Sequence, residues 1–132
     1  MSGIWIRPLA ALAFIFAATF PWDFQDHSHW NKVAWLPFVT GIVRPYDLLL
    51  NAALYLPLGY LVPARFRRRG LAAVAGTAVV ISGLLELTQV GSHVRFPSAT
   101  DSVMNVVGSV AGAAVANWRA NAIPPAGRAV SD

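Results

Sequence analysis

The chain has 132 residues, of which 56% are hydrophobic and only 12% charged, and its mean hydropathy is +0.53. A soluble domain carries about twice that charged fraction, so the composition indicates an integral membrane protein with one domain over residues 1–132. A chain of this length leaves no room for a separate soluble catalytic domain. The sequence contains no cysteine, which excludes disulfides, thiolate chemistry and cysteine-ligated metal sites.

The net charge of +4 and the isoelectric point near 10.4 reflect an excess of arginine and lysine over acidic residues. Arginine beside membrane helices usually sets topology, so we expect no nucleic-acid partner. No glycine-rich loop indicates a nucleotide site, and we expect no cofactor.

Four stretches have the length needed to cross the hydrocarbon core, about 17 to 25 mainly apolar residues. They are 4–22, 46–62, 70–90 and 102–118. The sequence therefore predicts an all-α bundle of four transmembrane helices. The first stretch has a second interpretation as a cleaved signal peptide, because Arg7 precedes an apolar run that ends in small residues. It continues through Phe20, Pro21 and Trp22 without a small-x-small site, which favours a retained helix.

The arginines orient this predicted bundle. They gather at both ends of the chain and in the loop after the second stretch: Arg7, Arg65, Arg67, Arg68, Arg69, Arg119 and Arg128. Because basic residues favour the cytoplasmic side, both termini and this loop are predicted to be cytoplasmic. The other two loops then lie outside and contain Lys32, Arg44 and Arg95.

Glu86 is the only charged residue in the apolar stretch 70–90. An acidic residue near the middle of a membrane helix costs roughly 2.5–3.5 kcal/mol, so such residues usually face protein or water. The topology puts Glu86 near the outer end of its helix. Helical spacing aligns three sets of polar or small residues. They are Ser82, Glu86 and Gln89; Asp47, Asn51 and Tyr55; and Asp101, Asn105, Gly108 and Gly112. We expect these faces to meet in the outer half of the bundle.

Small residues indicate how the helices approach one another. Gly108 and Gly112 form a small-xxx-small pair, which lets another backbone come close. We expect Gly76 and Gly83 to serve the third stretch in the same way.

The predicted packing brings amides to the buried carboxylate. Asn51 and Asn105 are expected to donate hydrogen bonds to Glu86, because a buried carboxylate needs such donors. We predict a ligand-binding site here and assign no catalytic residue. Its residues are Glu86, Gln89, Asn51, Arg95, Asp101, Asn105 and Arg44. The two arginines are suited to an anionic head group or to pairing with Glu86 and Asp101.

Simpler interpretations of the same residues stay open. The sequence SATD from Ser98 to Asp101 fits a capping box with Ser98 as N-cap. Asn51, Asn105 and Gln89 can hydrogen-bond between helices without any ligand.

A metal site is also considered, because the segment DFQDHSH offers potential ligands. These are Asp23, Asp26, His27 and His29. Their spacing is not that of a recognised zinc motif, so we expect no metal.

Several blocks resemble the VanZ-like family of small helical membrane proteins. They are WLPF at 35–38, NAALYLPLGYLVP at 51–63, ISGLLELTQ at 81–89, Arg95, and DSVMNVVGSVAG at 101–112. The family is named for a member linked to low-level teicoplanin resistance. The resemblance covers about residues 35–116 and implies a location in a bacterial inner membrane. The positions that match the family pattern are Asn51, Pro57, Gly59, Glu86, Gln89, Arg95, Asp101, Asn105 and Gly108.

Three functions fit this sequence. In the first, an outward-facing polar pocket binds or shields an envelope lipid or a lipid-linked cell-wall precursor, with a link to teicoplanin tolerance. In the second, a membrane enzyme uses Glu86 or Asp101 as acid or base on a lipid-linked substrate. In the third, the polar residues only hold the bundle together. We favour the first and expect membrane lipids as partners.

Overall fold

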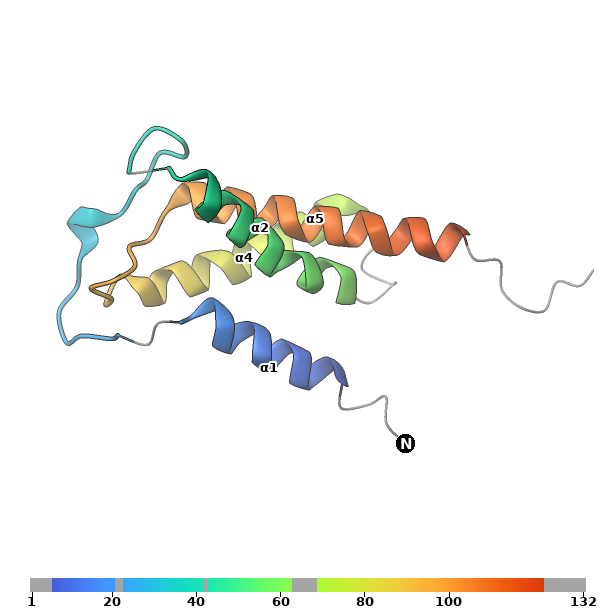
Figure 1. Cartoon of the computed structure of the whole chain (residues 1–132), viewed down its shortest axis with the longest axis horizontal. Helices are drawn as coiled ribbons and strands as arrows, with labels where there is room; N and C mark the ends of the chain where they lie inside the picture. Colours follow the sequence, from blue (N-terminus) through green and yellow to red (C-terminus); the bar gives the residue numbers. More distant parts are fainter. Residues whose placement is uncertain (1–5, 21–22, 42, 63–68, 123–132) are drawn as a thin grey trace, which may run out of the picture.

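The structure is a computed structural model that describes residues 6–20, 23–41, 43–62 and 69–122. Its elements are four α-helices and one short 3-10 helix (Figure 1). They are α1 (Ile6–Ala18), η1 (Trp30–Lys32), α2 (Pro45–Leu61), α4 (Leu71–Gln89) and α5 (Ala99–Ala122). No strand occurs in these ranges, so the predicted all-α class is confirmed.

The helix bounds follow the apolar stretches, with differences at the ends. α2 and α4 agree with the predicted stretches 46–62 and 70–90 to within a residue. α5 has 24 residues and extends past the predicted 102–118 at both ends. α1 has 13 residues and is shorter than the predicted 4–22, of which residues 4, 5, 21 and 22 lie outside the described part. Its end ahead of Pro21 has a local cause, because proline disfavours helical backbone in the residue before it.

Two of the described helices, α4 and α5, are long and apolar enough to cross a membrane. α2 has 17 residues, close to the lower limit for a span. Length and composition therefore make α4 and α5 candidate membrane spans, and they do not establish the predicted four.

α5 is the central helix of the bundle and packs against both α2 and α4. Glycines bring α2 and α5 into backbone contact. A Cβ on Gly108 would overlap the carbonyl oxygen of Ala52, and a Cβ on Gly112 would overlap that of Leu56. Gly59 of α2 meets the backbone of Ser109 in the same way. The predicted close approach at Gly108 and Gly112 is confirmed.

The corresponding prediction for α4 is wrong. Among the described residues, a Cβ on Gly76 or Gly83 would meet nothing within 4 Å. These two glycines therefore do not hold a neighbouring backbone close. α4 packs on α5 instead through a face that contains Val74, Ala78 and Ser82, all of them buried.

The described helices bury small and polar side chains and expose large apolar ones. Ala78, Ser82 and Ala113 are at most 1% exposed, whereas Leu49 is 70% exposed and Leu84 is 61% exposed. This distribution is the reverse of a soluble domain, in which leucine is among the most buried residues. Small residues at helix contacts are typical of helices that pack in lipid.

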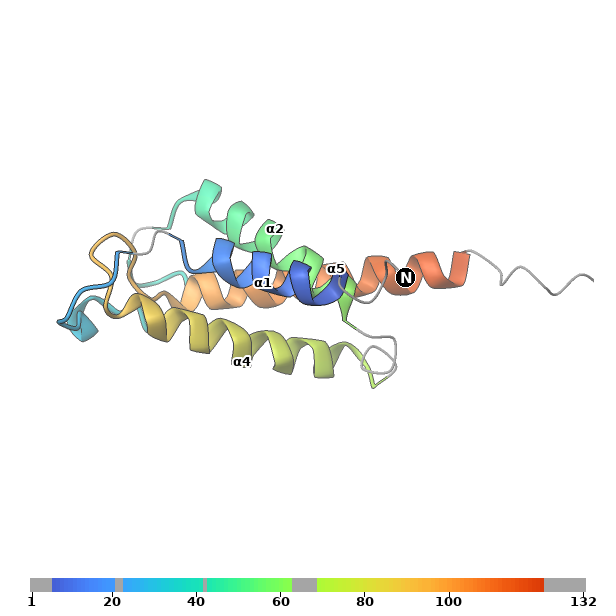
Figure 2. The ribbon, with the colours of Figure 1, turned by 90° about the horizontal axis from the view of Figure 1, so that it is seen from below.

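Two loops meet at one end of the bundle and form a cap, residues 23–41 and 91–98, here called the loop cap. The backbone N–H of Gln25 donates to Gly91 O and that of His29 to Val90 O, both at 2.8 Å. Farther along, Ala34 N–H donates to Pro97 O at 2.9 Å. The described start of α1 and the end of α5 lie at the opposite end (Figures 1 and 2). The two loops thus act as one unit.

Candidate functional site

The N-terminus of α5 is held by residues from two segments. Ser98 is its N-cap, and Ser98 Oγ accepts a hydrogen bond from the Asp101 N–H at 3.4 Å. The Ser98 N–H in turn donates to Glu86 Oε2 of α4 at 2.8 Å. The predicted N-cap at Ser98 is confirmed, but the capping box is not complete. Glu86, which is 8% exposed, accepts the Ser98 N–H from a neighbouring helix in place of Asp101.

A second polar contact joins α4 and α5 one turn deeper. Asn105 Nδ2 donates to Ser82 Oγ at 2.9 Å, and Ser82 Oγ lies 3.2 Å from Ser102 Oγ. Asn105 was expected to donate to Glu86, so this partner was predicted wrongly. The reason is depth, since Asn105 faces Ser82 rather than the carboxylate, which lies one turn farther out.

Two carbonyl oxygens on this contact have no partner among the described residues. They are Gln89 Oε1 and Asn105 Oδ1, both buried. Gln89 is 6% exposed and Asn105 3% exposed. Most residues of the three predicted polar faces are buried, as expected, while Asp47 and Asp101 are half-buried.

A cavity of about 970 Å³ lies between the loop cap and the adjoining ends of α2 and α5, and we call it the cap cavity. Four of the predicted site residues line it: Arg44, Asn51, Arg95 and Asp101. Glu86, Gln89 and Asn105 do not line it and belong to the α4–α5 contact. The predicted site is thus divided into a cavity and a helix contact.

Three cations and two acids line the cap cavity. The cations are Lys32, Arg44 and Arg95, and the acids are Asp47 and Asp101. The Asn51 amide lies beside the Asp101 carboxylate. Asn51 therefore partners this acid rather than Glu86, for which it was predicted as a donor.

The loop fold determines where Arg95 lies. Ser92 Oγ accepts the backbone N–H groups of Val94 and Arg95, at 3.2 and 3.1 Å. The Arg95 guanidinium donates to Phe20 O at 3.2 Å, so it bridges the end of α1 to the loop cap. Arg95 also lies within electrostatic range of Glu86 and Asp101. Both halves of the divided site therefore face the same cation.

Lys32 was not among the predicted site residues, although it is one of the three basic residues in the loops that were predicted to lie outside. Its ammonium lies 4.5 Å from the centroid of the Phe96 ring. Both residues line the cap cavity. The sequence feature that indicates Lys32 is the same as for Arg44 and Arg95: it is a basic residue in a loop on the side predicted to have few basic residues.

A family model described as VanZ/LLP1 matches residues 4–120. The chain belongs to the VanZ/LLP1 family. The resemblance seen in the sequence is thus confirmed, and the match reaches beyond residues 35–116. No curated protein and no solved structure matches the chain. Family membership and the two apolar helices together indicate a membrane protein.

Three of the blocks that resemble the family pattern lie on helices of this VanZ/LLP1 protein, while WLPF at 35–38 and Arg95 lie in the loop cap. Residues 51–62 lie on α2 and its C-cap, 81–89 on α4 and 101–112 on α5. α2 and α5 meet at the glycine contact, and α4 and α5 meet at Ser82 and Asn105. The three helical blocks are therefore neighbours in space around the central helix.

Proposed function

We propose that this VanZ/LLP1 protein crosses a bacterial inner membrane four times and binds an anionic head group in the cap cavity. The ligand class is an envelope lipid or a lipid-linked cell-wall precursor. The observation that supports this most is the set of three cations on a 970 Å³ cavity at the loop end of the bundle.

Exposed apolar side chains and the lengths of the helices support the membrane part of the proposal. Large apolar side chains cover the outer faces of α2, α4 and α5, as Leu49, Leu84 and Val115 illustrate. At 1.5 Å per residue, α2 is roughly 26 Å long, near the 30 Å thickness of the hydrocarbon core. The loop cap lies at one end, and the start of α4 and the end of α5 lie at the other (Figure 2). Arg69 precedes the start of α4 and Arg119 belongs to the last turn of α5, which favours a cytoplasmic location for this end and both termini.

The ligand part rests on the composition of the cavity wall. Arg44 and Arg95 offer planar donor groups suited to phosphate or carboxylate oxygens. Leu50, Leu54 and Phe20 supply apolar surface on the same cavity, which suits the start of a lipid chain. A head group with both charge and an attached chain fits this wall better than a free ion.

Catalysis by Glu86 fits the contacts less well. Glu86 accepts the Ser98 N–H and does not line the cap cavity. Asp101 is the acidic candidate at the cavity, and its carboxylate already lies beside the Asn51 amide. A general acid or base must reach its substrate, so binding is the function we favour.

Lipid binding tests the proposal directly. Purified protein is mixed with phosphatidylglycerol or phosphatidylcholine, and retained lipid is counted by native mass spectrometry. We expect preferential retention of phosphatidylglycerol. The double variant Arg44→Gln/Arg95→Gln should lower it at least about tenfold, because a hydrogen bond to a charged group contributes roughly 1.5–3 kcal/mol.

The control is Arg119→Gln, which removes a charge at the far end, where the Arg119 guanidinium donates to the Tyr60 hydroxyl at 3.1 Å. It should leave retention unchanged. Because Arg95 also holds Phe20 O, Arg95→Lys is included to keep the charge. Equal retention of phosphatidylglycerol by wild type and the double variant would show that the cap cavity is not the binding site.

The link to teicoplanin is tested separately in a sensitive bacterial host. Expression of the wild-type chain should raise the inhibitory concentration of teicoplanin, and Arg44→Gln/Arg95→Gln should abolish the rise at equal protein level. If wild type gives no rise, the tolerance part of the proposal is wrong while lipid binding stands on its own assay.

A further inference from the structure

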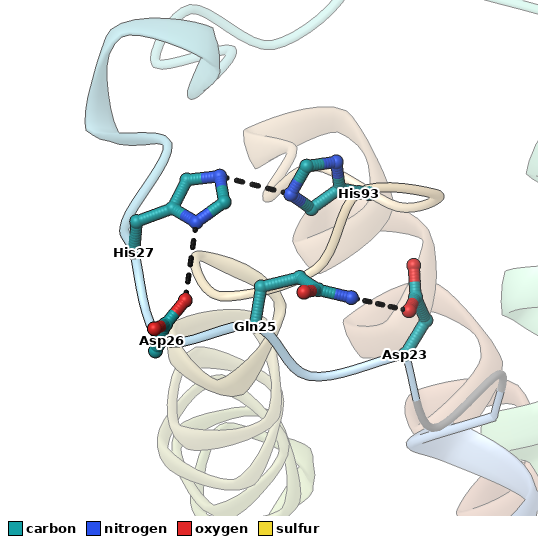
Figure 3. A network of polar contacts seen from close by, with 5 residues as sticks. All are labelled: Asp23, Gln25, Asp26, His27 and His93. Atoms are coloured by element: carbon teal, nitrogen blue, oxygen red, sulfur yellow. Dashed lines mark hydrogen bonds and ion pairs between the residues drawn. The ribbon is translucent and has the colours of Figure 1, made fainter.

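Three histidines from two loops meet within the loop cap. His27 and His29 follow α1, and His93 follows α4. The Nε2 atoms of His27 and His93 are 2.9 Å apart (Figure 3). One nitrogen from each of the three rings lies within 4.8 Å of the others. These are the only three histidines of the chain.

The backbone holds this cluster together from both sides. The Gln25 N–H donates to Gly91 O, and the His29 N–H donates to Val90 O, each at 2.8 Å. His27 lies between Gln25 and His29 in the sequence, and His93 lies two residues after Gly91. The segments that carry the rings are therefore paired before any ligand binds, which lowers the entropy cost of bringing them together.

The side chains around the rings are those that metal sites use. His27 Nδ1 faces Asp26 Oδ1 at 3.5 Å, while His27 Nε2 faces His93 (Figure 3). A carboxylate on the far nitrogen of a ligating histidine is the usual outer-shell arrangement. Within the described structure, the buried His29 Nδ1 has no hydrogen-bond partner. A buried polar atom without a partner is stabilised when a ligand binds to it.

We propose that His27, His29 and His93 bind a divalent transition-metal ion of the zinc type, which links the two loops of the loop cap. Imidazole nitrogen is a preferred ligand of such ions. In a tetrahedral zinc site with bonds of about 2.0–2.1 Å, ligand nitrogens are about 3.3 Å apart. The spacings here, from 2.9 Å to at most 4.8 Å, reach that value by small ring rotations.

Three protein ligands leave one coordination position for a small molecule or a group at the cavity rim. Phe96 connects the two sites, because its ring lies 5.8 Å from the His29 ring and also lines the cap cavity. The metal would therefore order the same loops that carry Lys32 and Arg95. This inference does not depend on what the cap cavity binds.

Zinc titration of the purified, untagged protein in detergent tests the site. The protein is first stripped with a chelator, and calorimetry with Zn²⁺ should give one site per chain. His27→Gln and His93→Gln should each weaken binding by more than about tenfold, the loss typical even of outer-shell changes. The control Asp23→Asn alters the same loop, where Asp23 accepts from Gln25 Nε2 at 2.8 Å, and should bind as wild type.

Two further measurements separate a real site from loss of folding. His27 and His93 are exposed, so both variants should melt at the wild-type temperature without metal. Added Zn²⁺ should then raise the melting temperature of wild type and not of the variants. Cobalt in place of zinc should give the visible absorption of a tetrahedral site. Wild-type affinity equal to that of His93→Gln, or no saturable binding, would overturn the proposal.

Discussion

The backbone N–H of Ser98 donates a hydrogen bond to Glu86 Oε2 at 2.8 Å, so a carboxylate of α4 caps the N-terminus of α5. In a capping box the third helical residue makes this bond to the N-cap. Here that residue is Asp101, which makes only the other bond of the motif: its backbone N–H donates to Ser98 Oγ. The Asp101 side chain is therefore left to line the cap cavity beside Asn51.

Replacement of Glu86 tests the interhelical cap. Glu86→Ala leaves the Ser98 N–H without its acceptor, and an unsatisfied buried donor costs about 1–3 kcal/mol. We expect a lower midpoint of thermal unfolding in detergent. Glu86→Gln keeps a carbonyl oxygen at the same place and should stay close to wild type.

Thr88→Ala is the matched control for this experiment. Thr88 lies on α4, and its hydroxyl donates to the Leu85 carbonyl of its own helix. Its unfolding midpoint should not change. If Glu86→Gln is as unstable as Glu86→Ala while Thr88→Ala is not, the charge rather than the acceptor position is what the fold needs.

The glycine contact yields a second prediction. Gly108→Ala places a methyl group against the Ala52 carbonyl, and the neighbour is backbone, which cannot rotate away. Overpacking of this kind costs about 1–3 kcal/mol. Gly76→Ala meets nothing within 4 Å and removes a flexible residue from a helix, so it should be neutral or stabilising. Thermal unfolding of the two variants should therefore shift in different directions or by clearly different amounts.

The helices and their buried faces could be predicted from the sequence. Apolar stretches and a spacing of three to four residues place Ser82, Glu86 and Asn105 on buried surfaces, as found. The hydrogen-bond partners of these buried side chains could not be predicted in the same way. Ser98 reaches Glu86 only because the loop after α4 folds back on the helix end, and no periodic pattern encodes that fold.

The histidine cluster illustrates the same limit. His29 and His93 are far apart in the sequence, and they meet because two irregular loops pair through backbone groups. Backbone pairing of this kind leaves little trace in side-chain chemistry. Spacing rules for zinc motifs consider one sequence segment at a time, so they indicated no metal site in the segment 23–29.

A double-mutant cycle measures the contact between Ser82 and Asn105. Each residue is replaced by alanine alone and together, and the free energy of unfolding is followed in a denaturing detergent. Hydrogen bonds between membrane helices average about 0.6 kcal/mol, and we expect a coupling energy of that size. The reference pair is Asn105 with Thr77, whose hydroxyl bonds the Ala73 carbonyl of its own helix and should show no coupling.

Cysteine labelling tests the proposed topology, and the absence of native cysteine makes the background clean. Val94→Cys and Leu36→Cys place thiols on the two loops of the loop cap, where the native side chains are 63% and 57% exposed. Both should react with a membrane-impermeant maleimide added to intact cells. Ala120→Cys, at the far end of α5, should react only after the membrane is opened.

Leu84→Cys distinguishes a lipid-facing surface from a water-facing one. Leu84 is 61% exposed, as much as the loop positions, yet it lies within α4. A thiol in hydrocarbon does not ionise, and the thiolate is the species that reacts. This variant should stay unlabelled in intact and in opened membranes and react only once the protein is unfolded. Labelling at the rate of Val94→Cys in intact cells would mean that α4 faces water, and the four-span topology would be wrong.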